Sequence, residues 1–189
     1  MVRAAAELIR TKGVSGTGMR EIVQVANAPR GSLQSYFPGG KDQLVSEALR
    51  WMGGVAAHRV LRVAAHIDPR TPGALFAGTV DLWRQEFLTS GFGGGCPLVG
   101  AAADVASTSE SLRTVISDGF DGWQRPLEEV LQSMRVPKQR SATLAMVMLS
   151  ALEGAIVLSR VRRSVEPLDA VAQELAPFLD AAIPKGTQH

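Results

Sequence analysis

The side chains best suited to specific chemistry lie in one short polar run near the N-terminus. Apart from Leu33, residues 30–35 combine a guanidinium, an amide, two hydroxyls and a glycine. The members of the run are Arg30, Gly31, Ser32, Gln34 and Ser35. Donors of these kinds bind base edges and phosphates, and a face without bulky groups approaches a DNA major groove closely. The pattern favours DNA binding over the alternative, an ordinary helical hairpin with a solvated exterior.

Two short helices and a tight corner must position this run. The first helix is predicted from small and apolar residues at helical spacing, with Thr17 and Gly18 as candidates for its N-terminal cap. Those residues are Met19, Ile22, Val23 and Ala26. The corner is residues 27–29, Asn-Ala-Pro, because Asn tolerates the left-handed conformation that ends a helix and Pro suits the first turn of the next. In the second helix, residues 30–37, the side chains available for the core are Leu33, Tyr36 and Phe37.

The stretch from residue 17 to residue 44 resembles the helix-turn-helix of the TetR family of one-component transcriptional repressors. The family pattern is an apolar pair, a small-residue corner, a Gly-x-Leu-Tyr-x-Tyr-Phe recognition helix and a Lys-x-x-Leu helix start. The matching positions are Ile22, Ala26, Leu33, Tyr36, Phe37, Lys41 and Leu44. Pro29 stands where Ser or Thr is common, and Gln34 replaces an aromatic residue that often lies against the DNA backbone. The resemblance implies a dimer that binds a partly palindromic, double-stranded DNA operator.

Two sets of DNA contacts are predicted on this interpretation. Side chains, backbone N–H groups and helix starts would hold phosphates. The predicted phosphate contacts are Thr17, Gly18, Ser32, Ser35, Tyr36 and Lys41. The predicted contacts to base edges are Arg30, Gly31, Ser32 and Gln34. The charge distribution agrees, because residues 1–50 hold seven Lys or Arg against four acids, whereas the whole chain has a net charge of only +2.

The sequence beyond this motif predicts helices only. No alternating period-2 segment is present, so we expect an all-α fold of about nine helices without a sheet. A chain of 189 residues suffices for one or two domains. We expect a three-helix helix-turn-helix domain at residues 1–46 and a helical ligand-binding and dimerisation domain at residues 47–189. Besides the two helices of the motif, the predicted helices span about residues 2–12, 41–65, 73–88, 97–106, 110–134, 138–162 and 168–183.

The last two predicted helices carry apolar surface for an interface between two copies of the chain. The helix over residues 138–162 is apolar nearly all round in its central part, so it needs cover on two sides. The last helix adds an apolar stripe at Leu168, Val171, Leu175, Leu179 and Ile183. A homodimer through these helices, with two-fold symmetry, would cover both surfaces. Segments 95–98 and 152–155 and the helix around Trp123 also look like the C-terminal part of a TetR subgroup that includes LmrA and YxaF.

Aromatic residues in the C-terminal part point to a pocket for a ligand. Trp83 and Phe87 are four positions apart and Phe120 and Trp123 are three apart, so each pair shares a helical face. Core packing accounts for these residues equally well; the alternative is the wall of a small-molecule pocket between helices. Pro126 would kink the helix beside such a pocket. We expect a small apolar or aromatic effector, which acts through its different affinity for two shapes of the dimer.

Other functions have little support. The glycine run at residues 91–95 lacks the Lys-Ser/Thr of a phosphate-binding loop, and His58, His66 and Cys96 lack the spacing of a metal site. No catalytic residue, metal or cofactor is predicted; the alternative function is an all-helical enzyme or carrier with a hydrophobic pocket. The single cysteine excludes an intramolecular disulfide and fits a cytoplasmic protein. The longest apolar segment, residues 142–158, is short and interrupted by polar groups, so no membrane span is expected.

Overall fold

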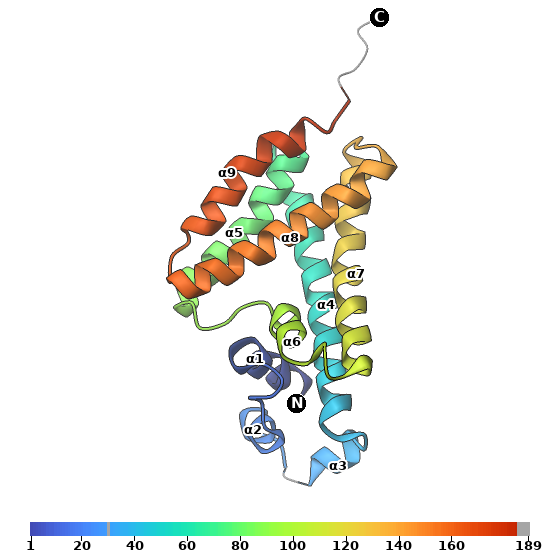
Figure 1. Cartoon of the computed structure of the whole chain (residues 1–189), viewed down its shortest axis with the longest axis vertical. Coiled ribbons are helices and arrows are strands. Elements are labelled where there is room, and N and C mark those ends of the chain that lie inside the picture. The colour runs from blue at the N-terminus through green and yellow to red at the C-terminus, as the bar shows by residue number, and fades with distance from the viewer. Residues whose placement is uncertain (30, 185–189) are drawn as a thin grey trace, which may run out of the picture. The chain divides into compact units, whose positions relative to one another are not determined.

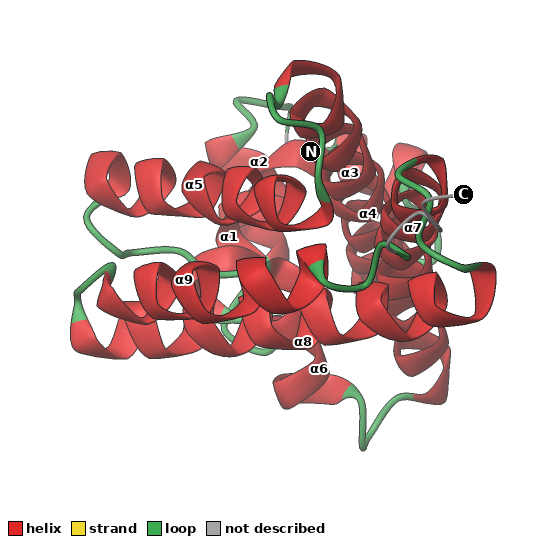
Figure 2. Cartoon of the chain, turned by 90° about the horizontal axis from the view of Figure 1, so that it is seen from above, coloured by secondary structure: helices red, strands yellow, loops and turns green. Residues whose placement is uncertain are grey.

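The computed structural model describes residues 1–29 and 31–184, and these residues form nine helices and no strand (Figure 1). Figure 2 shows the same chain as helices joined by loops, and the predicted all-α fold is confirmed. The helices are α1 (Val2–Lys12), α2 (Met19–Val25), α3 (Ser32–Tyr36), α4 (Gly40–His66), α5 (Pro72–Ser90), α6 (Pro97–Val105), α7 (Glu110–Ser133), α8 (Lys138–Arg162) and α9 (Glu166–Asp180). They divide into two compact units: Met1–Val55 with Gly94–Gly122, and Ala56–Gly93 with the chain from Trp123 onward.

The first unit is built around α1, which packs against both α2 and α6. Its core contains fully buried apolar side chains, among them Ala5, Ile9, Ile22, Leu44 and Leu49. Gly13 ends α1 with a φ of 74°, a left-handed conformation that glycine adopts without strain. Helices α4 and α7 approach at a pair of glycines, since a Cβ atom on Gly53 would lie 3.3 Å from the Cα atom of Gly119. A larger residue at Gly53 would force these two helices apart.

The second unit is a layer of helices in which α5 packs along α9 and α8 packs against both. The side chain of Thr71 caps α5 by accepting the backbone N–H of Ala74 at 3.2 Å. The N–H of Gly73 donates to the Asp180 carboxylate of α9 at 2.6 Å. A Cβ atom at Gly73 would lie 2.6 Å from the carbonyl oxygen of Ala176, so a side chain there would push α9 away from α5.

The observed bounds of α8 agree with the predicted bounds at both ends, whereas the bounds of α9 and α3 differ from those predicted. Helix α9 begins at Glu166 rather than near the predicted residue 168, because Pro167 fits the first turn of a helix, where a missing N–H breaks no helical bond. The chain leaves α8 at Arg163, which has a left-handed φ of 51°. Helix α9 ends at Asp180 rather than near residue 183. Helix α3 spans only Ser32–Tyr36, so the helix predicted over residues 30–37 is shorter than expected.

Candidate nucleic-acid interface and ligand core

At the corner between α2 and α3, Asn27 has the predicted left-handed conformation, but Pro29 lies before α3 and not in its first turn, because α3 begins at Ser32. Asn27 takes a φ of 48°, and the N–H of Ala28 donates to the carbonyl of Val23 at 3.0 Å, which ends α2. The N–H of Ser32 then donates to the carbonyl of Pro29 at 3.0 Å as α3 begins.

Most of the residues predicted to contact DNA lie on the surface of this motif. Gly18, Gly31, Gln34, Ser35 and Tyr36 are exposed, and Ser32 and Lys41 are partly buried. Arg30 lies outside the described residues. Tyr36 is 68% exposed, so its predicted place in the core is wrong, whereas Phe37 is 7% exposed and fills that place. Tyr36 is the last residue of α3, and Phe37 follows it with a non-helical φ of −130°, so the backbone changes direction between the two rings.

Two hydroxyl groups predicted to hold phosphates are used inside the fold. Thr17 has no exposed surface, and its hydroxyl donates to the carbonyl oxygen of Gly13 at 2.6 Å. A side chain without exposed surface cannot reach a phosphate, so Thr17 is removed from the interface and stabilises the turn before α2. The hydroxyl of Ser32 donates to the carbonyl of Pro29 at 2.6 Å. Ser32 therefore stabilises the start of α3, and its hydroxyl proton is already engaged.

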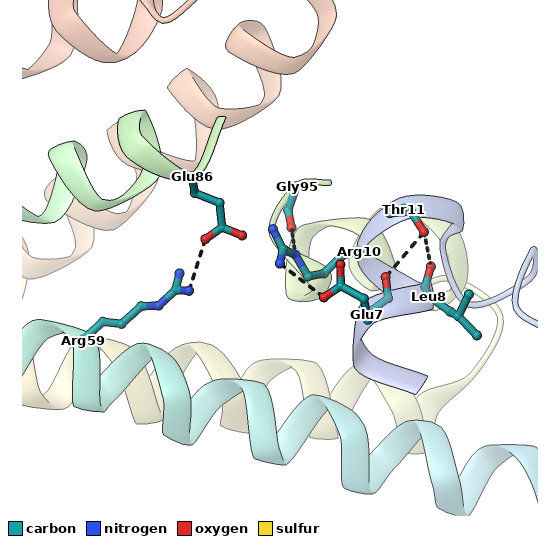
Figure 3. A network of polar contacts seen from close by, with 7 residues as sticks. All are labelled: Glu7, Leu8, Arg10, Thr11, Arg59, Glu86 and Gly95. Carbon is teal, nitrogen blue, oxygen red and sulfur yellow. Dashed lines mark hydrogen bonds and ion pairs between the residues drawn. The ribbon is translucent and has the colours of Figure 1, made fainter. Parts of the chain in front are cut away.

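Helix α6 and the segment just before it bind the residues that lead into the motif, through polar contacts that the sequence did not predict. The Asp104 carboxylate accepts the backbone N–H and the hydroxyl of Ser15 at 2.6 and 2.7 Å. These bonds favour the charged form and hold the pKa of Asp104 below its ordinary value. Arg10 Nε donates to the carbonyl of Gly95 at 3.2 Å (Figure 3). A Cβ atom at Gly13 would lie 2.9 Å from the Asp104 carboxylate, so glycine at this position leaves room for the contact.

The four residues predicted to bind a ligand lie in both compact units. Trp83 and Phe87 are buried on α5 with ring centroids 6.0 Å apart, which confirms that they share a face. The Arg59 guanidinium lies 5.8 Å from the Trp83 ring centroid and pairs with Glu86 at 3.1 Å (Figure 3). Phe120, by contrast, is partly buried and belongs to the first unit.

Trp123, the fourth predicted ligand residue, borders an apolar void in the second unit. Its side chain lies on α7 and is 3% exposed. The void is a narrow packing gap that has no room for a water molecule. It is lined by α5, α7 and α8 through Phe76, Thr79, Trp123, Leu127, Met148, Leu149 and Leu152. Within the described part of the chain, the buried Nε1 of Trp123 has no hydrogen-bond partner.

Helix α8 has one buried and one exposed side. Exposed residues recur at helical spacing along the other side, which we call the α8 face. The α8 face consists of Thr143, Met146, Val147, Ser150, Gly154, Val157, Leu158 and Val161. By length and composition α8 is the one described helix that could span a membrane, yet half of its most apolar stretch is buried within the chain, as in an ordinary core helix. Leu168 and Leu179 of the predicted α9 stripe have no exposed surface. Their predicted role in a dimer interface is wrong, because packing within a single chain already buries them.

Known proteins resemble both the N-terminal and the C-terminal part of this chain. Residues 1–48 match the family described as bacterial regulatory proteins, tetR family, and residues 72–174 match the transcriptional regulator LmrA/YxaF-like C-terminal domain. An uncharacterised HTH-type transcriptional regulator of Mycobacterium tuberculosis H37Rv is 36% identical over 98% of this chain and 95% of its own length. The HTH-type transcriptional regulator LmrA of Bacillus subtilis is 30% identical over 89% of this chain and 88% of its own length.

Solved structures share the fold at lower identity. The regulatory protein TetR from Rhodobacter sphaeroides superposes with a TM-score of 0.81 at 20% identity, over 93% of this chain and 95% of that one. A cysteine mutant of the TetR family regulator CifR, solved with a 26-base-pair double-strand operator DNA, superposes with a TM-score of 0.77 at 20% identity over 94% of each chain. Likenesses at this identity support the fold alone.

Proposed function

The chain belongs to the TetR family of bacterial regulatory proteins, and we propose that it is a repressor that binds a two-fold DNA operator as a homodimer. A small apolar molecule would bind the C-terminal part and release the DNA. The observation that carries the proposal is the exposed polar surface of α3, which follows a tight corner and holds Gln34, Ser35 and Tyr36 away from the core. Because such a regulator acts on chromosomal DNA, we assign it to the cytoplasm.

Base recognition is assigned first to Gln34. Its amide is exposed, and an amide of this kind can form two hydrogen bonds with the edge of an adenine. Arg30 is retained as a second base contact from its position in the sequence. Phosphates are assigned to Ser35, Tyr36 and Lys41, which carry hydroxyl and ammonium donors at or beside α3. These roles divide the surface into residues that set sequence preference and residues that set overall affinity.

Two exposed glycines support a close approach of DNA to this surface. Gly18 has a φ of −93° and Gly31 a φ of −77°, so neither needs the conformational freedom of glycine. A Cβ atom at either position would meet nothing within 4 Å in the protein. The fold therefore does not require glycine here, whereas a DNA strand lying against the backbone would. We assign Gly18 to a phosphate contact and Gly31 to close approach at the base edges.

The α8 face is assigned to the dimer interface. Val157, Leu158 and Val161 are 43, 48 and 78% exposed in a single chain, and Phe178 on α9 is 49% exposed. Gly154 lies in the middle of the face with open space around it, so a second helix can approach its backbone. Two copies of α8 and α9 about a two-fold axis would form a four-helix interface. Such a dimer would place two copies of α3 in successive major grooves.

The effector is assigned to the apolar core of the second unit, beside Trp83, Phe87 and Trp123. These side chains are nearly fully buried, so a ligand among them would be removed from water. Phe120 remains a prediction from the sequence. Release of DNA requires that the ligand bind one dimer shape more tightly than the other, because equal affinity for both would leave the equilibrium unchanged.

Selection of duplexes from a random pool tests the proposed function. Purified protein at low salt should enrich a sequence with two-fold symmetry whose half-sites are about one helical turn apart. Its binding should weaken steeply as salt rises, because phosphate contacts release bound counterions. Failure to enrich any sequence at low salt would refute operator binding.

A further inference from the structure

We propose that the indole N–H of Trp123 selects effectors that carry a hydrogen-bond acceptor. The ligand would be a small neutral molecule, apolar except for one acceptor such as a carbonyl oxygen, bound where the void between α5, α7 and α8 widens. This inference rests on the proposed ligand-responsive function and specifies the chemical class of its ligand.

The first support is the state of the Trp123 donor. The residue is 3% exposed, and its Nε1 has no partner among the described residues. An indole nitrogen can only donate, and buried tryptophans usually place this N–H on an acceptor or an ordered water. The adjoining void is too narrow for a water molecule. A ligand that brings an acceptor within reach of Nε1 would satisfy a group that has no partner among the described residues.

The second support is the chemistry of the remaining wall. Among the lining residues Thr79 is the one other side chain with a polar atom, and its hydroxyl already donates to the carbonyl of Leu75 at 2.8 Å. The rest of the lining is aliphatic or aromatic, so an ionic ligand would leave its charge unpaired. The wall therefore favours a neutral ligand and leaves Trp123 as the donor that orients it.

The third support is that the wall contains elements that can move. Met148 has a flexible side chain that repacks readily around a ligand. Pro126 lies inside α7 three positions after Trp123 and removes one backbone hydrogen bond from the helix. A ligand larger than the present space requires such rearrangement, and repacking of Met148 together with bending of α7 at Pro126 would provide it.

Two probes of nearly equal shape test the proposal: acetophenone, which has a C=O group, and α-methylstyrene, which has C=CH2 in its place. The full-length protein is labelled with ¹⁵N at tryptophan, and the Trp123 signal is assigned by its loss in Trp123→Phe. Acetophenone should shift this signal downfield and bind about 3- to 10-fold more tightly than α-methylstyrene, as one neutral hydrogen bond provides. Trp123→Phe should remove the preference, and Trp51→Phe, at an exposed position on α4, should keep it.

Equal affinity of the two probes for the wild type would overturn the proposal, as would failure of both to bind or an unchanged preference in Trp123→Phe. The ratio of the two probe affinities for the wild-type protein tests the proposal even if Trp123→Phe does not fold. All measurements are made without DNA. If the probes fail this test, the proposed operator binding is unaffected. If no operator is selected, the preference for acetophenone is unaffected.

Discussion

The carboxylate of Asp104 on α6 accepts two hydrogen bonds from Ser15, one from its backbone N–H at 2.6 Å and one from its hydroxyl at 2.7 Å. Ser15 lies in the loop between α1 and α2, so the pair fixes the segment that leads into the helix-turn-helix. The bonds from Ser15 are the main reason that the pKa of Asp104 is lowered, and the charge of Lys41 adds to the effect. The stability of this loop is therefore linked to the ionisation of one carboxyl group.

Replacing Asp104 by Asn should lower the free energy of unfolding at neutral pH by on the order of 1 kcal/mol, since a partly exposed carboxylate loses charge-assisted bonds. Because the folded pKa is lowered from 3.8, the contribution is complete above that value and disappears as the pH falls through the folded pKa. Urea unfolding of wild type and variant should show a difference that shrinks as the pH is lowered from about 7 towards 2. The exposed acid Asp121 provides a control as Asp121→Asn. A difference independent of pH would contradict the linkage.

Gly31→Ala should reduce operator affinity by roughly tenfold or more, because the added methyl group would hold the DNA away from α3. Its free energy of unfolding should change by less than about 0.5 kcal/mol, since a Cβ atom there meets no protein atom. Fluorescence anisotropy and urea unfolding measure the two effects. Gly54→Ala is the matched control, an exposed glycine on α4 with the same open surroundings. Equal operator affinity of the two variants would show that DNA does not approach Gly31.

Gln34→Ala and Lys41→Ala should weaken DNA binding in different ways. Loss of the Gln34 amide should relax base preference at one position of each half-site, with a cost of about 1–3 kcal/mol on the preferred operator only. Loss of Lys41 should weaken binding to all duplexes and lower the slope of log affinity against log salt by about 1. Titrations of operator and scrambled duplex over a salt series separate these outcomes. Identical behaviour of both variants would contradict the division of roles.

Val157→Lys should convert the dimer to a monomer, because a charge on the α8 face would be buried without a partner in the interface. Light scattering at micromolar concentration measures the mass, and far-UV circular dichroism checks that the helices persist. Leu88→Lys changes an apolar residue on α5 that is somewhat more exposed, at 55% against 43% for Val157, and should leave the dimer intact. A wild-type monomer at this concentration would refute the assignment of the α8 face.

The sequence predicted where helices begin and end better than it predicted which of their residues are buried. For α8 both ends agree, yet its apolar residues occupy nearly every position, so periodicity could not separate buried Leu152 from exposed Val157. Packing against α5 and α9 makes that distinction. In the same way, Thr17 has the right chemistry for a phosphate contact, but the nearby carbonyl of Gly13 engages its hydroxyl. The type of a residue limits which partners its side chain can bind, and the groups that surround it in the fold determine which partner it binds.

The sequence pointed to a pocket at Trp123, but the other walls of the void could not be predicted, because they come from helices that are distant in sequence. Helical spacing correctly paired Trp83 with Phe87 within one helix. It gave no means of finding that Thr79 and Met148 lie around the same space as the indole ring. Likewise, the bonds between Ser15 and Asp104 join residues 89 positions apart, a separation over which local patterns carry no information.

The compact unit that contains the helix-turn-helix is assembled from two separate stretches of the chain, Met1–Val55 and Gly94–Gly122. Recombination between related genes with one crossover after the motif would transfer α1 to α3 without the Asp104 that binds Ser15 or the Gly95 that binds Arg10. The recipient would have to supply equivalent groups at both places. A hybrid regulator designed for a new operator should therefore carry both stretches together.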